Sequence, residues 1–198
     1  MADDSPDLER LRRFQAGDVA AFAEIVRAYQ KRIVTLCRYL LGNAADADDA
    51  AQDVFVKAFK NLKNFRPEAA LYTWLYRIAV NTCIDHRRRP FFLSLFRADD
   101  AGEGADAAVP ALRSEEPSPE QVVESQQAAE EIQRALKKLS PKLRAAIVLK
   151  EIEGLRYEEI GEVLEISLGT VKSRISRARE ELKRALIDGR EQNGPRAV

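Results

Sequence analysis

A chain of 198 residues with 45% hydrophobic residues is long enough to bury one core or two small ones, and this composition excludes wholesale disorder. The 32 basic and 32 acidic residues cancel, which by itself argues against a nucleic-acid partner. The charges are unevenly spread, however. Residues 60–89 hold 7 basic and 2 acidic residues (net +5), and residues 167–198 hold 8 and 4 (net +4). Residues 90–122 hold 2 and 7 (net −5), so two basic segments flank an acidic one, which indicates polyanion contact at two places.

Several classes of protein are excluded early. The N-terminal segment is charged, and no run approaches the roughly 20 apolar residues of a membrane span, so a cytoplasmic location is expected. Cys37 and Cys83 lie in apolar helical patterns and are expected to be buried thiols. The only histidine, His86, stands beside three arginines and is expected to be exposed or next to a phosphate. With no triad, metal-ligand cluster or phosphate-binding loop, the sequence predicts no enzyme activity, cofactor, metal or small-molecule substrate.

Helical periodicity dominates the first 90 residues. Proline suits the first position of a helix, aspartate caps a helix start, and glycine ends one. These signals predict helices that begin at Pro6, at Asp18 (ending near Leu41) and at Asp46, and a fourth from about residue 70 to residue 89, before Pro90. Phe59 is expected on the core face of the third helix, and a break is expected around residues 65–67.

Residues 91–118 mix glycine, proline, alanine and acids without sustained periodicity, which is typical of a linker, although Phe91–Phe96 is apolar enough to pack on something. Helix signals then resume. They predict helices from Ser118-Pro119 to about 139, from Ser140-Pro141 to Gly154, from Tyr157 to Leu164 and from Leu168 to about 187, with Leu143, Ile147, Val148 and Ile152 on one face of the second. The predicted fold class is all-α, with two small helical domains (1–90 and 119–198) joined by a flexible linker (91–118).

The last two predicted helices form the sharpest motif. Apolar residues recur at spacings of four, three, four and four along the second of them, and Gly161 is small where two helices must cross closely. This pattern is typical of a helix-turn-helix. The apolar anchors are Val171, Ile175, Ala178, Leu182 and Leu186, and the outward face carries Lys172, Ser173, Arg174, Ser176, Arg177 and Arg179. Such donors can bind guanine edges or phosphates in the major groove.

The fourth helix carries aromatic and basic residues together. Leu71, Trp74, Leu75 and Ile78 are compatible with an ordinary core, which leaves Arg77 and Asn81 unexplained. Aromatic rings beside cations suit single-stranded DNA, whose unstacked bases lie on rings, and an asparagine amide can read a flipped base. Core packing and a DNA groove both remain open from these residues alone.

The third helix shows Gln52, Asp53 and Val56 on its outward face. An exposed valine beside polar groups suggests a docking surface, and a solvated helix face is the plainer alternative.

Three stretches together resemble the signature segments of extracytoplasmic-function (ECF) sigma factors of the sigma-70 family. They read DADDAAQDVFVKAF, FRPEAALYTWLYRIAVNTCIDHRRR and LRYEEIGEVLEISLGTVKSRISRARE, in the order and at the separations usual in that family. The resemblance extends from about Leu8 to Ile187. It implies a promoter-specific initiation factor, in which the first domain binds core RNA polymerase and opens the −10 element and the second reads the −35 element.

The resemblance assigns residues to each role. For core polymerase binding these are Asp49, Gln52, Asp53, Phe55 and Val56. For the −10 element they are Asn81 and the loop around Phe65 to Ala69. Together with the aromatic and basic residues of the fourth helix, the candidate −10 residues are Phe65, Arg66, Tyr72, Trp74, Arg77, Asn81, Arg87 and Arg88. For the −35 element they are Thr170, Lys172, Ser173, Arg174, Ser176 and Arg177. The implied partners are core RNA polymerase, promoter DNA and an anti-sigma factor, often membrane-bound, and the acidic linker is expected to mimic nucleic acid inside the polymerase.

Two positions depart from the family pattern, namely Asp53, where glutamate is more frequent, and Ser176, where some relatives carry a large aromatic. Two other classes of function compete with the sigma factor. An operator-binding regulator would use the C-terminal domain on duplex DNA and would usually dimerise. An enzyme or RNA-binding adaptor lacks both a catalytic cluster and the strands of an RNA-binding module.

Overall fold

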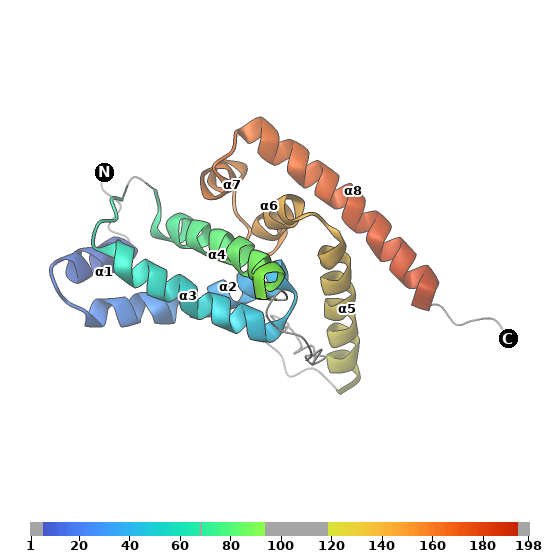
Figure 1. The fold of residues 1–198 in the computed structure, drawn as a ribbon, viewed down its shortest axis with the longest axis horizontal. Coiled ribbons are helices and arrows are strands. Elements are labelled where there is room, and N and C mark those ends of the chain that lie inside the picture. Colours follow the sequence, from blue (N-terminus) through green and yellow to red (C-terminus); the bar gives the residue numbers. More distant parts are fainter. Residues whose placement is uncertain (1–5, 68, 94–118, 194–198) are drawn as a thin grey trace.

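The computed structural model describes residues 6–67, 69–93 and 119–193 (Figure 1). These residues form eight α-helices and no strand, which confirms the predicted all-α class. The helices are α1 Pro6–Gln15, α2 Ala20–Leu41, α3 Ala44–Leu62, α4 Leu71–Leu93, α5 Pro119–Lys138, α6 Pro141–Glu151, α7 Tyr157–Leu164 and α8 Leu168–Asn193. The predicted linker from residue 94, including the end of its apolar start, lies outside the described residues.

Helices α1–α4 form an N-terminal unit in which α2 contacts each of the other three (Figure 1). Its core contains Ile25 and Ile33 of α2, Val54 of α3 and Leu75 of α4, none of them accessible to solvent. Burying side chains of this size is the main stabilising term of such a bundle, at about 1.5–3 kcal/mol each. Both cysteines are buried free thiols, as predicted.

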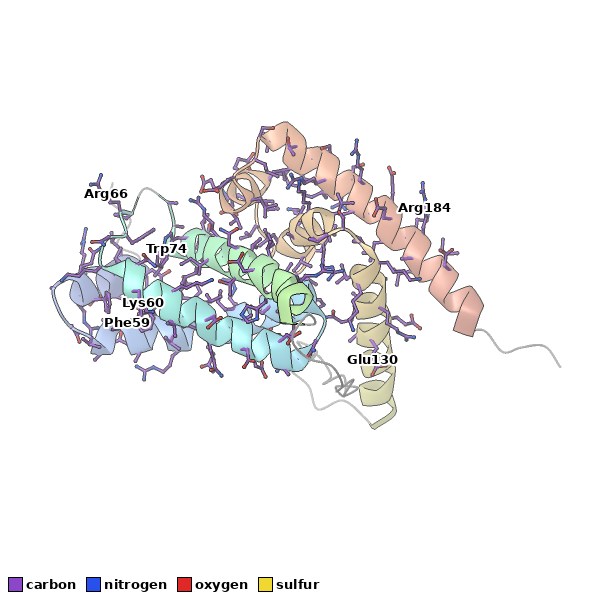
Figure 2. The ribbon with its side chains drawn as sticks, in the orientation of Figure 1. Phe59, Lys60, Arg66, Trp74, Glu130 and Arg184 are labelled. Carbon is purple, nitrogen blue, oxygen red and sulfur yellow. The ribbon has the colours of Figure 1, made fainter. Side chains whose placement is uncertain are left out.

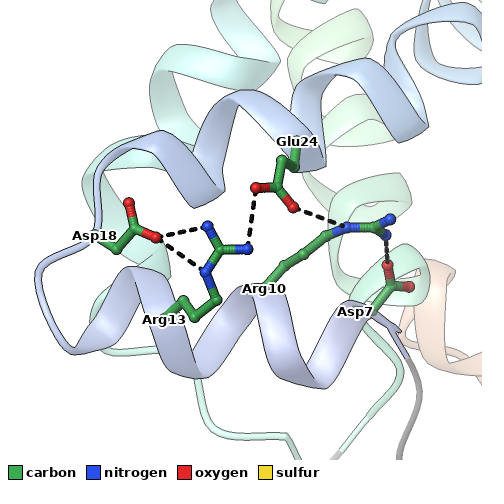
Figure 3. Close-up of polar contacts among 5 residues, drawn as sticks. All are labelled: Asp7, Arg10, Arg13, Asp18 and Glu24. Atoms are coloured by element: carbon green, nitrogen blue, oxygen red, sulfur yellow. Dashed lines mark hydrogen bonds and ion pairs between the residues drawn. The ribbon is translucent and has the colours of Figure 1, made fainter.

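The hairpin between α1 and α2 is tied by ion pairs on its outer side (Figure 3). Arg13 contacts Asp18 at 2.7 Å and Glu24 at 3.0 Å. Arg10 contacts Asp7 at 3.0 Å and lies 3.8 Å from Glu24. Hydrogen bonds from Arg13 lower the pKa of the Asp18 carboxyl. Because these groups are partly exposed, the network orients the hairpin more than it stabilises the fold.

Several helix ends differ from the sequence prediction; α8, for example, runs to Asn193 rather than to about residue 187. The third helix begins at Ala44 rather than at Asp46, because the Asn43 side chain accepts hydrogen bonds from the N–H groups of residues 45 and 46. Gly42 ends α2 as predicted, with φ +74° in the left-handed region. The fourth helix continues through Pro90 to Leu93 instead of ending at 89. Proline lacks the N–H donor and its ring crowds the carbonyl four residues earlier, and α4 ends only three residues after Pro90.

Helices α5–α8 form a C-terminal unit in which α8 contacts each of the other three. Ser140 caps α6 by accepting the Leu143 N–H at 3.4 Å. Every residue from 144 to 149 is buried, so the predicted one-sided apolar face is wrong. The reason is that α6 contacts α7 and α8 on one side and α2 of the N-terminal unit on another. Ile152, predicted on the buried face, is 39% exposed because it lies past the end of α6.

The two units pack against each other. Helix α7 lies along α4, and α2 contacts both α5 and α6 (Figure 1). Arg144 of α6 is 1% exposed, and its Nη1 donates to the Leu40 carbonyl at the end of α2 at 2.8 Å. The described residues therefore form one assembly in which the C-terminal unit covers part of α2 and α4.

Candidate nucleic-acid and polymerase interfaces

The helix-turn-helix is built by local contacts at the α7–α8 turn. Glu159 Oε2 accepts the Arg156 N–H at 2.6 Å at the start of α7. Glu165 ends α7 in the left-handed conformation, with φ 54°. The Ile166 N–H donates to the Gly161 carbonyl at 3.0 Å, so the chain turns tightly over Gly161. A Cβ at position 161 would lie 3.0 Å from the Ile166 oxygen, which explains why a residue without a side chain stands there.

The start of α8 presents its polar side to solvent. Val171, Ile175 and Ala178 are buried against α6 and α7, as the spacing predicts. Lys172, Ser173, Ser176 and Arg177 are exposed, whereas Thr170 and Arg174 are half-buried. These six are the residues assigned to the −35 element, and four of them lie on one open face.

The far half of α8 differs from the expected donor face. Arg179 binds Glu151 of α6 at 2.7 Å, so its guanidinium is engaged within the C-terminal unit. Leu182 and Leu186, expected as buried anchors, instead line an open groove between α6 and α8. The exposed polar face assigned to the −35 element is therefore confined to the first turns of α8.

An aromatic pair lies at the start of α4. Phe65, in the loop after α3, packs on Trp74 with ring centroids 4.9 Å apart, and both residues are half-buried. Figure 2 labels Trp74 on α4. Arg66 beside them is exposed. Asn81 lies seven residues after Trp74 on the same helix and is exposed, as is Arg87. The side chain of Arg88 lies outside the described residues.

Helix α7 covers Tyr72 and Arg77, so these two side chains are not part of that open surface. The Tyr72 hydroxyl lies 2.5 Å from Glu159 Oε1, and Arg77 Nη2 donates to the Glu162 carbonyl at 2.8 Å. Burial and the bond to Glu159 raise the pKa of Tyr72. Burial acts to raise the pKa of Glu159 as well, but the bonds from Tyr72 and from the Arg156 N–H lower it on balance. The eight residues assigned to the −10 element therefore do not form one continuous open groove in this arrangement.

The outward face of α3 carries a stripe at helical spacing. Asp49, Gln52 and Val56 are exposed, and Val56 shows half of its surface. Asp53 is half-buried because its carboxylate meets His86 Nε2 of α4 at 2.9 Å. Phe55 is also half-buried, at the margin of this stripe, where it packs on the core.

Several contacts escaped the sequence analysis. His86 is not exposed; its side chain is 14% exposed and contacts Asp53. Phe59, expected in the core, is 41% exposed and packs edge-on against Phe14 and Phe22 (Figure 2). Arg144 is a cation within an apolar run, which is the signal that predicts a buried structural arginine. The other contacts join elements far apart in sequence, and no local pattern indicates them.

Within the described residues, no three His, Cys, Asp or Glu side chains gather as metal ligands would. In the same part of the chain, no helix combines the length and the apolar character that crossing a membrane requires.

Two family models match the chain. The model described as Sigma-70 region 2 matches residues 25–90, and the model described as Sigma-70, region 4 matches residues 129–182. Together they span more than half of the sequence. The first covers the faces of α3 and α4 described above, and the second covers the helix-turn-helix.

Full-length relatives agree with these matches. The chain is 39% identical over 180 residues to the ECF RNA polymerase sigma factor SigW of Bacillus subtilis, covering 91% of this chain and 96% of that protein. It is 37% identical over 187 residues to the ECF RNA polymerase sigma-E factor of Escherichia coli, covering 92% and 95%.

Solved structures give the same placement. The structure of CnrH in complex with the cytosolic domain of CnrY has a TM-score of 0.66 and 27% identity, over 93% of this chain and 99% of that chain. The sigma factor RpoE of Bartonella quintana, in complex with the anti-sigma factor NepR, shares the fold with a TM-score of 0.64 and 24% identity, over 85% and 98%. These findings decide against the operator-binding regulator and the RNA-binding adaptor. The chain belongs to the extracytoplasmic-function sigma factors, which are transcription initiation factors rather than enzymes.

Proposed function

We propose that this protein binds core RNA polymerase through α3, reads the −35 promoter element with α8 and opens the −10 element with α4. The observation that carries the proposal is the open donor face at the start of α8, held by a helix-turn-helix within a sigma-factor chain. A family member with an accessible recognition face and an exposed α3 stripe has both surfaces that promoter-directed initiation requires.

At the −35 element, Lys172 and Arg177 are the long cations on the open face of α8. Either can bind the O6 and N7 of guanine or a phosphate. Ser173 donates to the Thr170 carbonyl at 3.0 Å, so its hydroxyl oxygen remains an acceptor for a base amine. The half-buried Thr170 and Arg174 are better placed at the edge of this face, which suits phosphate contacts.

At the −10 element, the Phe65–Trp74 pair offers a ring surface on which an unstacked base can lie. Asn81 is exposed farther along α4, where its amide can both donate to and accept from a base edge. Arg66 and Arg87 are exposed at the two ends of this surface, and we assign them, with Arg88, to the phosphates. Tyr72 and Arg77 would join them once α7 moves away.

The α3 stripe of Asp49, Gln52 and Val56, with Asp53 and Phe55 at its margin, is our candidate for the polymerase contact. It lies in the N-terminal unit, which we take as residues 1–90, followed by a linker over 91–118 and the −35-reading unit over 119–198. We assign the protein to the cytoplasm, where core polymerase is found. An anti-sigma factor is the third expected partner, because the sigma factor RpoE of Bartonella quintana, which shares this fold, is complexed with the anti-sigma factor NepR.

The deciding experiment is runoff transcription with purified bacterial core polymerase and a panel of promoter templates, with and without this protein. Promoter-selective transcripts that require the protein are expected. A matched pair of variants tests the docking face. Val56→Asp places a charge on the α3 stripe, whereas Val19→Asp makes the same change at a residue 63% exposed at the start of α2.

Val56→Asp should abolish the transcripts and binding to core enzyme, since a buried unpaired carboxylate at an interface costs several kcal/mol. Val19→Asp should leave both intact. Tight promoter binding by the wild-type protein alone, without stimulation of the polymerase, would count against the whole proposal. Equal loss in the two variants would count against the α3 assignment only.

A further inference from the structure

The two units meet through contacts that involve residues assigned to DNA. Arg77 of α4 pairs through Nη1 with Glu165 Oε1 at 3.3 Å, in addition to its bond to the Glu162 carbonyl. Tyr72 lies one and a half turns earlier and binds Glu159. The acidic edge of α7 therefore supplies oxygen acceptors to a tyrosine and an arginine of the −10 surface.

Phosphate oxygens of DNA would bind the same Tyr72 and Arg77 donors that these acceptors occupy. A guanidinium donates hydrogen bonds to carboxylate and phosphate oxygens in the same bidentate geometry. The Arg77 side chain is only one third exposed, and within the described residues its Nε is buried without a partner. Glu165 is 68% exposed, so its ion pair with Arg77 contributes little. The contact is therefore incomplete, and a ligand that satisfies all the guanidinium donors would displace it.

A second set of contacts holds α7 in this place. Glu153, in the turn before α7, has a side chain only 4% exposed and accepts from Arg32 of α2 at 3.2 Å and from the Tyr76 hydroxyl at 2.5 Å. The Arg32 guanidinium also lies 5.4 Å from the centre of the Tyr76 ring. A buried carboxylate with two partners from the other unit disfavours separation, because removing either partner would leave it undersatisfied.

We propose that α7 is an intramolecular competitor of single-stranded promoter DNA. While the two units are packed together (the closed form), α7 covers Tyr72 and Arg77 of α4. Separation of the units frees both side chains for the −10 strand. The proposal rests on the proposed function, since it assumes that these two residues bind DNA. Among the described residues, Trp74 and Asn81 form no hydrogen bond or ion pair with α7, so the closed form blocks part of the surface and weakens strand binding rather than abolishing it.

Arg32 offers a way to open the molecule without touching either DNA surface. Arg32→Glu sets two carboxylates against each other at Glu153, and Glu153→Gln weakens the same contact from the other side while keeping the size of the side chain. Arg27→Glu is the matched control, because Arg27 is an exposed residue of the same helix for which the described residues show no ion pair. All three variants and the wild type are used as full-length protein, with folding checked by thermal unfolding.

Two quantities are measured on the free protein. One is the radius of gyration by small-angle X-ray scattering. The other is the affinity, by fluorescence anisotropy, for a labelled single strand that covers the −10 region of a promoter found in the runoff assay. Apparent affinity scales with the fraction of open molecules, so opening a protein that is about 10% open should raise it up to about tenfold.

Arg32→Glu and Glu153→Gln are expected to increase both the radius of gyration and the affinity. Arg27→Glu should raise neither the radius of gyration nor the affinity, and its added negative charge should slightly weaken DNA binding. The affinity of Arg32→Glu would therefore rise even though its own added negative charge acts to weaken DNA binding. An enlarged molecule with unchanged strand affinity would overturn the competitor role, and so would a wild-type protein that is already extended in solution. Either of these two outcomes is compatible with normal runoff activity. If the wild-type protein failed to support core-dependent transcription, the proposed function itself would be refuted.

Discussion

Asn81 is the single residue on which the proposed opening of the −10 element depends most. It is exposed on α4, outside the area that α7 covers. Asn81→Ala should slow formation of the open promoter complex while the closed complex forms normally, since a flipped base loses its partner only after the strands separate. A base contact of this kind is worth about 1–3 kcal/mol. Permanganate footprinting of the melted strand, beside gel-shift measurement of the closed complex, separates the two steps.

The control for Asn81 is Gln30→Ala, which removes an exposed amide from α2, away from the proposed DNA surface. It should leave both steps unchanged. If Asn81→Ala reduced the closed and open complexes equally, the residue would be a general DNA contact and the base-pocket assignment would be wrong.

His86 contributes to the α3 surface by orienting a neighbour. It holds the Asp53 carboxylate at 2.9 Å across the α3–α4 contact. His86→Ala should weaken binding to core polymerase by roughly 1 kcal/mol, or about fivefold, which is the net value of one such hydrogen bond. His86→Gln, which keeps a donor, should recover most of the affinity in the same titration of labelled protein with core enzyme. Equal affinity in all three proteins would mean that Asp53 needs no orientation by His86.

At the scale of elements, the crossing of α7 and α8 leaves no room for a larger residue at Gly161. A Cβ there lies 3.0 Å from a backbone oxygen and 3.8 Å from Val171 Cγ2. Gly161→Val should lower the free energy of unfolding by about 1–3 kcal/mol through overpacking. Urea denaturation measures the change. Gly169→Val is the control, since nothing lies within 4 Å of a Cβ at that position, and it should cost clearly less.

Element boundaries show which signals are local. The sequence places α7 at Tyr157–Leu164, as the structure has it, because the start at Arg156 and the end at Glu165 depend on bonds within the segment itself. The cap of α3 is misplaced by three residues, since Asn43 and Asp46 both carry good capping side chains. The extent of α4 is also missed, because a proline near a helix end is tolerated.

At the scale of the whole molecule, Arg144 joins the two units. Nη1 donates to the Leu40 carbonyl, and Nη2 donates to the carbonyls of Lys137 at 2.7 Å and Leu139 at 3.3 Å. Burial lowers the pKa of this arginine to about 10, so it remains charged at neutral pH. Arg144→Met should destabilise the protein by roughly 3–5 kcal/mol, because three carbonyls lose a charged donor.

The measurement for Arg144 is the same urea denaturation, with Lys142→Met as control on an exposed position of α6. That control should stay within about 0.5 kcal/mol of the wild type, as surface changes usually do. If the two variants were equally stable, the hydrogen bonds of Arg144 would contribute nothing net beyond the cost of burying its charge.

The sequence by itself determined the helical class, the turn of the helix-turn-helix and the exposed residues at the start of α8, because each depends on spacing and capping within a few residues. It also yielded the sigma-factor resemblance, through three motifs in register. Only the tertiary structure decided that α6 is buried all round, that His86 holds Asp53 and that α7 covers Tyr72 and Arg77. These features pair residues from different helices, whose meeting depends on how whole helices pack.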